Sequence, residues 1–186
     1  MAQGDGRRDT VDGIVAVWRA ELPAVAGPGL ELSKRAGRLS ALLGEVAAVP
    51  LVRLGLTKAE YEVLAVLRAA GAPYRLRPTD LTSRLLLSSG GTSNLLRRLA
   101  DAGLVAREAD PRDARSSWVR LTTEGVVTAE MAVRAATAAA DELLRGVPAD
   151  VVRAAADAMR ELLLELGDVP KPARDEPGRP GGVAAV

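Results

Sequence analysis

Residues 78–122 read PTDLTSRLLLSSGGTSNLLRRLADAGLVAREADPRDARSSWVRLT, and this stretch decides the fold. Proline suits the first turn of a helix, and the helical spacing of the apolar residues predicts a short helix over 78–86. A second helix is predicted over 89–102, with Ser88 as its cap and Gly103 as its stop. Two helices joined by so few residues are typical of a helix-turn-helix.

The residues after the second helix change from helical spacing to strand-like runs. Two strands are predicted over 104–108 and 118–122, and the polar, turn-rich residues 109–116 lie between them. Arg112 and Arg115 are expected near the tip of this loop. A charged β-hairpin directly after a helix-turn-helix predicts a winged helix-turn-helix, so the expected fold class is mainly α with a small β-hairpin wing.

Helical periodicity also predicts helices on both sides of this segment. They cover residues 10–22, 31–54, 57–70, 124–145 and 149–166, and the connector 72–74 can add a short strand. Pro50 is expected to kink or break the second helix, whereas Thr57 and Glu60 have the spacing of a capping box. The apolar faces of the outer helices suit a dimer interface, although a single monomeric bundle would use the same faces.

The composition argues against an enzyme and against a membrane protein. Cysteine and histidine do not occur, which removes thiol chemistry, the commonest zinc ligands and the usual general base. No paired-carboxylate motif, phosphate loop or nucleophile elbow compensates, so we expect no catalytic residue, no metal and no cofactor. The amino terminus has no apolar signal segment, and no run of 18 apolar residues occurs, so we expect a cytoplasmic protein.

The net charge of +1 hides an uneven distribution of charge along the chain. Residues 75–120 contain nine arginines against five acidic residues, whereas residues 121–170 contain four arginines against nine acidic residues. The first segment therefore suits an anionic partner and the second does not. A localised basic segment that coincides with a helix-turn-helix favours double-stranded DNA as this partner.

The predicted helix 89–102 is the candidate recognition helix. Glycines in its first turn let backbone N–H groups approach a phosphate, and its hydroxyl, amide and guanidinium groups can contact bases or phosphates. The wing arginines suit a narrow minor groove. The candidate DNA-binding residues are Ser88, Ser89, Gly90, Gly91, Thr92, Ser93, Asn94, Arg97, Arg98, Arg112 and Arg115. Two alternatives stay open: the serines and glycines can merely shape a turn, and Arg97 or Arg98 can pair with Asp101.

The chain from Leu56 to Gly125 resembles the MarR family of bacterial regulators. The resemblance rests on the order and spacing of the segments GLT at 55–57, PTDL at 78–81, SSGGTSN at 88–94, LADAGLV at 99–105, DPRDAR at 110–115 and VRLT at 119–122. It implies a homodimer that places two recognition helices about 34 Å apart, one turn of DNA, on a pseudo-palindromic operator.

The extra amino-terminal helix resembles the branch of that family that responds to urate and similar organic anions. The resemblance implies a ligand site of Trp, Asp, Arg and Arg, which fall here on Trp18, Glu62, Leu95 and Arg107. Leu95 lacks the arginine, so the site should bind a dianion less well, and we expect a different small organic anion or an apolar acid. Trp18, Glu62 and Arg107 are the candidate ligand-binding residues, although a lone tryptophan on an amphipathic helix can simply pack.

These observations predict a sequence-specific regulator, in our interpretation a repressor, that binds DNA as a homodimer and is released by a small organic anion. The expected parts are an amino-terminal extra helix and dimerisation helix (1–54), the winged helix-turn-helix (55–122), carboxy-terminal dimerisation helices (123–167) and a disordered tail (168–186). One alternative is a DNA-binding regulator without a small ligand. Another is a protein-interaction module that keeps the winged shape but does not bind DNA.

Overall fold

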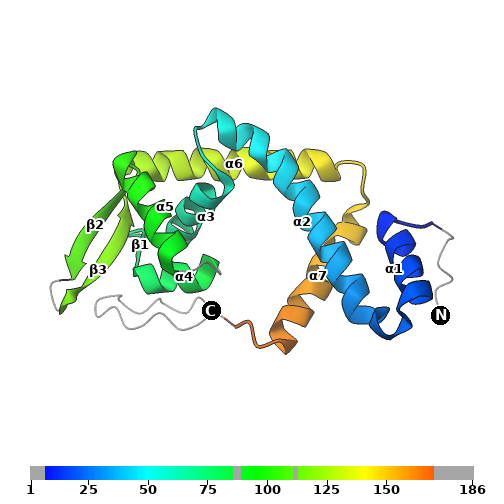
Figure 1. The fold of residues 1–186 in the computed structure, drawn as a ribbon. Coiled ribbons are helices and arrows are strands. Elements are labelled where there is room, and N and C mark those ends of the chain that lie inside the picture. Colours follow the sequence, from blue (N-terminus) through cyan, green and yellow to red (C-terminus); the bar gives the residue numbers. More distant parts are fainter. Residues whose placement is uncertain (1–6, 86–88, 111–112, 170–186) are drawn as a thin grey trace, which may run out of the picture. The chain divides into compact units, whose positions relative to one another are not determined.

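The computed structural model describes residues 7–85, 89–110 and 113–169 (Figure 1). Its elements are the helices α1 (Thr10–Glu21), α2 (Pro28–Arg53), α3 (Lys58–Ala69), α4 (Pro78–Leu85), α5 (Ser89–Asp101), α6 (Thr123–Leu144) and α7 (Ala149–Glu165), the 3-10 helix Pro23–Val25, and the strands β1 (Arg75–Leu76), β2 (Val105–Asp110) and β3 (Asp113–Leu121). The chain divides into two compact units, residues 1–143 and 144–186.

The predicted fold class is confirmed. The strands form one antiparallel sheet in the order β1-β3-β2, and helices make up most of the remaining described chain. Helices begin where the sequence supplies caps. The side chain of Thr57 accepts from the Glu60 backbone N–H, and the Glu60 side chain accepts from the Thr57 backbone N–H, as predicted. The hydroxyl of Thr122 accepts from the Gly125 backbone N–H at 2.9 Å and so caps α6.

Two helix predictions need correction. Helix α2 begins at Pro28 rather than near residue 31, because proline fits a first helical turn. The helix also continues through Pro50 to Arg53 instead of breaking there. Leu51, directly after the proline, is only 1% exposed and lies in the core, so its burial stabilises the last turn against the loss of one backbone hydrogen bond.

The sheet also differs from the prediction. Strand β1 starts at Arg75, just after the connector 72–74 that was expected to contribute it. Strands β2 and β3 extend further along the hairpin than predicted, with Asp110 paired to Asp113. Arg115 therefore lies within β3 and not in a loop. Backbone pairing needs no apolar side chains where a hairpin extends beyond the core, and hydrophobic patterning alone therefore places the strand ends too early.

The apolar core surrounds α3 and the inner face of the sheet, with contributions from α2, α4, α5 and α6. Its fully buried leucines and valines include Leu64, Leu67, Leu81, Leu99 and Val119. At the start of α6 the backbone comes very close to the residue before β2. A Cβ added to Gly125 would lie 1.9 Å from the Leu104 carbonyl oxygen, so only glycine fits this position without a backbone shift.

Helix α1 packs on α2 through Val11 and Val15, which are 3% and 4% exposed. Arg35 of α2 holds the start of α1, since its guanidinium donates to Asp9 at 2.8 Å and to Asp12 at 2.7 Å. The remaining members of the predicted apolar face of α1 (Ile14, Trp18 and Leu22) are exposed. The prediction of an amphipathic helix is thus confirmed, but its buried stripe is narrower than expected.

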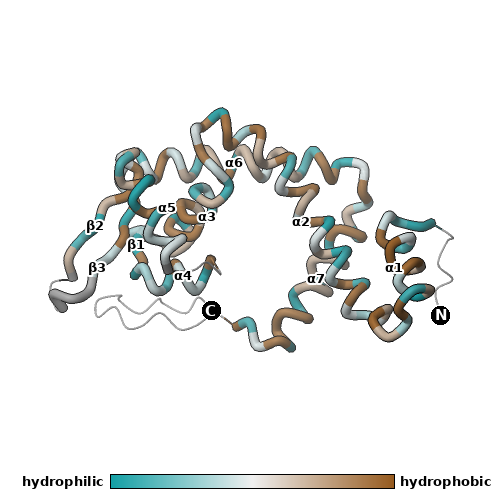
Figure 2. The backbone as a smooth tube through the Cα atoms, viewed as in Figure 1, coloured by the Kyte–Doolittle hydropathy of each residue, from teal (hydrophilic) through white to brown (hydrophobic). Residues whose placement is uncertain are grey.

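Helix α7, whose residues are all described, has no buried residue, although apolar residues recur along it (Figure 2). Of the predicted tail 168–186, only Asp168 and Val169 belong to the described residues. In the described chain, no single helix is both long and apolar enough to cross a membrane. Only α2 and α3 taken together reach that length and composition, and they are bent by 87° at the break between them.

Candidate nucleic-acid interface

Helices α4 and α5 pack against one another and against α3, which gives the helix-turn-helix predicted from the sequence. Leu96 and Leu99 place one face of α5 in the core, each at 1% exposure. The helix ends at Asp101, and Gly103, two residues further, has a φ of 72° that suits glycine. The opposite face is polar and exposed, and it carries Gly90, Ser93, Asn94, Arg97 and Arg98.

Arg97 and Asn94 act together on this exposed face. A guanidinium N–H of Arg97 donates to Oδ1 of Asn94 at 3.0 Å, across one turn of α5. The contact links two of the side chains that were predicted to reach bases or phosphates, and it leaves both exposed. Neither side chain has to leave the core to meet a ligand, so this pair is the best placed of the predicted DNA-binding residues.

Thr92 does not belong with them. Its side chain is 2% exposed, and its hydroxyl lies 3.2 Å from that of Thr82 in α4. This burial does not favour the predicted contact of Thr92 with DNA, which stays a prediction. Its position on the buried side of α5 turns the hydroxyl toward α4, where a hydrogen bond satisfies it.

Arg98 points to α3 rather than to the residue proposed as its partner. Its guanidinium lies 3.0 Å from Oε1 of Glu60, whose side chain is only 8% exposed, so the alternative pairing of Arg98 with Asp101 is wrong. The other oxygen of Glu60 accepts from the backbone N–H and hydroxyl of Thr57, at 2.8 and 2.7 Å. Burial by itself would raise the pKa of Glu60, but the Thr57 hydrogen bonds and the Arg98 charge outweigh it and hold this pKa below the ordinary 4.5.

The remaining predicted positions are only partly covered by the structure. Gly91 is half-buried in the first turns of α5. Ser89 and Arg115 lie in α5 and β3, but their side chains are outside the described residues, as are Ser88 and Arg112 altogether. The predicted contacts of these four residues with DNA stay predictions.

Comparison with known proteins places this architecture in a family. A sequence model of the MarR family matches residues 54–116. The HTH-type transcriptional regulator PecS of Dickeya dadantii is 30% identical over 115 residues, which cover 62% of this chain and 69% of PecS. This chain belongs to the MarR family. MarR-family members are DNA-binding transcriptional regulators, and the same therefore holds for this chain, which is not an enzyme.

One further relative and two solved structures are also similar to this chain. The multiple antibiotic resistance protein MarR of Escherichia coli is 34% identical over 77 residues, which cover 41% of this chain and 51% of that protein. A crystal structure of an E. coli MarR mutant complexed with operator DNA superimposes with a TM-score of 0.65 at 24% identity, covering 79% of this chain and 98% of that one. Sco5413 of Streptomyces coelicolor gives a TM-score of 0.67 at 24% identity, covering 77% of this chain and 99% of that one.

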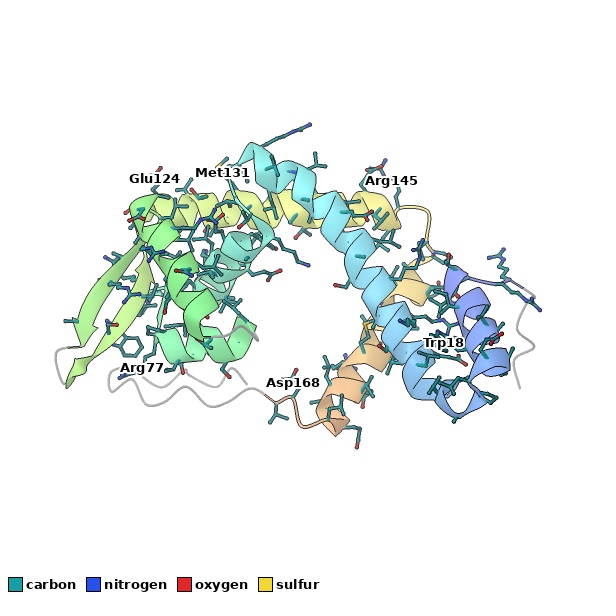
Figure 3. The ribbon with its side chains drawn as sticks, in the orientation of Figure 1. Trp18, Arg77, Glu124, Met131, Arg145 and Asp168 are labelled. Atoms are coloured by element: carbon teal, nitrogen blue, oxygen red, sulfur yellow. The ribbon has the colours of Figure 1, made fainter. Side chains whose placement is uncertain are left out.

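The three candidate ligand residues of this MarR-family chain come from three separate elements. Trp18 is 41% exposed on α1, which packs on α2 (Figure 3). Glu62 is half-buried in α3, and Arg107 is exposed in β2. Leu95, at the position where the resemblance implies a second arginine, packs against the core. Among the described elements, the main packing pairs do not include α1 with α3, α1 with β2, or α3 with β2. Among the described residues no group of three acidic side chains gathers as a metal site.

Four residues on or beside the sheet were not predicted to be functional: Arg75, Arg77, Trp118 and Arg120. In the structure the guanidinium of Arg75 lies 4.8 Å from the centroid of the Trp118 ring, and that of Arg77 lies 4.5 Å from it. The sequence carries a signal for them, because a polar residue or tryptophan alternates with an apolar residue in Arg75-Leu76-Arg77 and in Trp118-Val119-Arg120. Alternation of this kind places the polar members on one face of a strand, but only the pairing of β1 with β3 shows that they meet.

Proposed function

We propose that this MarR-family regulator is a cytoplasmic repressor that binds a pseudo-palindromic operator as a homodimer and leaves it when a small organic anion binds. The DNA-binding part of the proposal rests on the difference between the buried and the exposed face of α5. One face is anchored in the core by Leu96 and Leu99, and the other presents polar and basic side chains. A rigid helix with an exposed polar face suits the major groove.

The proposed DNA contacts follow from this geometry. Ser93, Asn94 and Arg97 would reach base edges or phosphates, and the backbone of Gly90 and Gly91 would approach a phosphate. The predicted contacts of Ser88, Ser89, Arg112 and Arg115 complete the proposed set. Arg98 keeps a place in this set only through its effect on α5, since its guanidinium already has Glu60 as a partner.

The homodimer is supported by large apolar side chains that the single chain leaves exposed. Met159 and Leu162 of α7 and Leu166, directly after it, recur at helical spacing and are 38%, 37% and 73% exposed. In α6, Val127 and Met131 are 54% and 50% exposed. Burying one side chain of this size contributes about 1.5–3 kcal/mol, so a second copy that covers these residues would gain substantially. We propose that residues 1–54 and 123–167 supply this interface and that residues 55–122 bind DNA.

The effector part of the proposal rests on Trp18, Glu62 and Arg107. An exposed indole offers an apolar surface to a planar acid, and an exposed arginine can pair with its carboxylate. Because Leu95 packs in the core, a monoanion or an apolar acid fits this set better than urate. Such a ligand releases the operator only if it binds the free conformer more tightly than the DNA-bound one.

A second candidate is a regulator without a small ligand. It is favoured by the separation of Trp18, Glu62 and Arg107 on three elements of the single chain. Thermal-shift screening of small organic acids distinguishes the two, because a ligand raises the unfolding temperature by mass action. A screen in which no acid raises the unfolding temperature of the wild type favours the second candidate.

The DNA-binding proposal is tested by titrating the protein against duplexes from its own upstream region over several salt concentrations. We expect specific binding that weakens steeply with salt and exceeds binding to a scrambled duplex. Sedimentation of the free protein tests the homodimer in the same preparation. Weak binding that is equal for both duplexes would contradict the proposal and favour the protein-interaction module.

A further inference from the structure

Hydrogen bonds through Leu104 and Thr122 connect the end of α5 to the start of α6. The Leu104 backbone N–H donates to the Leu99 carbonyl of α5 at 2.9 Å, and the Leu104 carbonyl accepts from the Thr122 backbone N–H at 3.1 Å. The Thr122 hydroxyl donates to the Gly103 carbonyl at 2.7 Å and accepts from the Gly125 N–H of α6 at 2.9 Å. The ends of the two helices are therefore held together at this point.

The backbone packs tightly in the same place. Gly125 is buried, and a Cβ added to it would lie 1.9 Å from the Leu104 carbonyl oxygen. The backbone of α6 thus lies directly against the backbone of the residue that leads from α5 into β2. A shift of α6 here would also displace the end of α5. We call Leu104, Thr122 and Gly125 the α5–α6 joint.

A second attachment lies about two turns further along α6. Glu130 accepts from Nε and Nη2 of Arg68, in the last turn of α3, at 2.9 and 2.7 Å. Both side chains are partly exposed, and ion pairs of this kind contribute little to stability. A helix attached at one point can pivot, whereas a second attachment fixes its direction. The Arg68–Glu130 pair therefore suits a role in orientation rather than in stability.

Helix α6 is long enough to convert a small tilt into a displacement that matters on DNA. Its 22 residues span roughly 33 Å. A tilt of about 10° over half of this length moves one end by about 3 Å, which is close to the rise of about 3.4 Å per base pair. In a homodimer that uses α6, the direction of this helix would therefore decide where each α5 lies relative to the other.

We propose that the α5–α6 joint and the Arg68–Glu130 pair together set the distance between the two recognition helices, and so the half-site spacing that the homodimer accepts. This inference rests on the proposed function, because it requires a homodimer on a pseudo-palindromic operator. Thr122, Gly125 and Glu130 are then positioning residues, which act on DNA binding through the placement of α5. The spacing of two half-sites is a geometric property of such a dimer and does not depend on further base contacts.

The first test measures DNA affinity as a function of half-site spacing. The operator is the shortest upstream duplex that the wild type binds in preference to a scrambled one. Two further duplexes carry one base pair more or one base pair fewer at its centre, which moves one half-site by about 3.4 Å and rotates it by about 35°. We expect the wild type to bind both respaced duplexes on the order of tenfold more weakly, as it would a mismatched site.

Two substitutions loosen the attachments separately. Thr122→Val removes the hydroxyl and keeps the branched shape, and Glu130→Gln removes the charge that pairs with Arg68. Each should reduce the tenfold difference to about threefold, and the double variant should nearly abolish it. Thr122→Ser keeps the hydroxyl and should restore the wild-type difference. A loss of stability alone would weaken binding to all three duplexes by the same factor, so the ratio of affinities separates positioning from folding.

Matched controls are available at the next two positions of the chain. Thr123 and Glu124 are exposed and take part in neither attachment. Thr123→Val and Glu124→Gln therefore repeat the same chemical changes, and the double control should keep the wild-type difference. Thermal unfolding of each variant establishes that it folds.

A distance measurement tests the same inference without DNA. The chain contains no cysteine, so Ala100→Cys at an exposed position of α5 gives one spin-label site in each copy. In the homodimer, pulsed electron paramagnetic resonance then measures the distance between the two recognition helices. The labelled protein should give a narrow distribution of distances. Adding Thr122→Val/Glu130→Gln should broaden or shift it, whereas adding Thr123→Val/Glu124→Gln should not.

The outcomes separate this inference from the proposed function. A wild type that is monomeric, or that binds no upstream duplex better than a scrambled one, contradicts the proposed function itself. A dimeric wild type that binds the operator but tolerates both respaced duplexes overturns the positioning role alone. The same holds if Thr122→Val/Glu130→Gln keeps the wild-type difference in affinity, or if it leaves the distance distribution unchanged.

Discussion

The guanidinium of Arg98 in α5 lies 3.0 Å from a carboxylate oxygen of Glu60 at the start of α3. Glu60 also completes the capping box of α3 with Thr57, at the positive end of the helix dipole. The same buried carboxylate therefore stabilises the start of α3 and pairs with Arg98 of α5. Removing either residue leaves the other without the oppositely charged group that pairs with it. The pair therefore links α5 to α3, and under the proposed function Arg98 would act on DNA binding by positioning α5.

Arg98→Gln and Arg97→Gln should affect the protein differently. We expect Arg98→Gln to cost about 1 kcal/mol of stability, because it leaves a largely buried carboxylate without its cation, and to leave the salt slope of DNA binding unchanged. Arg97→Gln should keep the unfolding temperature and reduce the salt slope by about 0.9 if Arg97 contacts one phosphate. Thermal unfolding and titrations at several salt concentrations measure both. Equal losses of slope in the two variants would show that Arg98 contacts DNA.

The stability of the fold should depend on pH through Glu60. Its pKa in the folded chain is lower than the ordinary 4.5. Such a group stabilises the folded state above its unfolded pKa, and this contribution is lost as the pH falls through the folded pKa. We therefore expect the unfolding temperature to fall as the pH is lowered below about 4.5, and to fall less in Glu60→Gln. Glu62→Gln, in the same helix, is the control. A pH dependence that is identical in wild type and Glu60→Gln would contradict the prediction.

Gly125→Ala should destabilise the protein. The new Cβ would lie 1.9 Å from the Leu104 carbonyl oxygen, and a backbone atom cannot rotate away as a side chain does. We expect a loss of about 1–3 kcal/mol, measured by urea unfolding. Gly37→Ala in the middle of α2 is the matched control, because nothing lies within 4 Å of its added Cβ. That control should instead gain up to about 1 kcal/mol from helix propensity.

Leu162→Asp should weaken the proposed homodimer. Leu162 lies on the exposed apolar side of α7 with Met159, so a carboxylate there would be buried without a partner in the proposed dimer. Sedimentation should show a shift toward monomer, and operator affinity should fall with it. Glu165→Gln, a polar exchange in the same helix, should leave the dimer intact. A monomeric wild type would contradict the proposal at once.

The helix-turn-helix was predictable because its signals are local. Thr57 and Glu60, which cap the preceding α3, are three residues apart. Gly103 has a φ of 72° just after α5, a conformation that glycine adopts readily and that stops the helix. Such contacts form within one or two turns and can be read from spacing alone. The wing strands were placed less well, because pairing between Asp110 and Asp113 depends on the partner strand and not on a hydrophobic pattern.

The same contrast between local signals and tertiary packing applies to the candidate DNA-binding side chains. Arg97 and Asn94 are three residues apart in one helix, and their exposure follows from the helical face opposite Leu96 and Leu99. Thr92 was predicted to contact DNA because it carries a hydroxyl group, whereas its burial depends on how α4 packs on α5. A polar residue type does not reveal which side of a helix is covered.

The sequence by itself determined the cap of α3, the helix-turn-helix followed by a hairpin, and the order of segments that identifies the MarR family. Only the tertiary structure decided that Arg98 pairs with Glu60 and that Arg75 and Arg77 stack on Trp118. The physical reason is distance along the chain. Helix caps and turns are stabilised by neighbours, whereas an ion pair between α5 and α3, or a stack between β1 and β3, exists only after the core has brought those elements together.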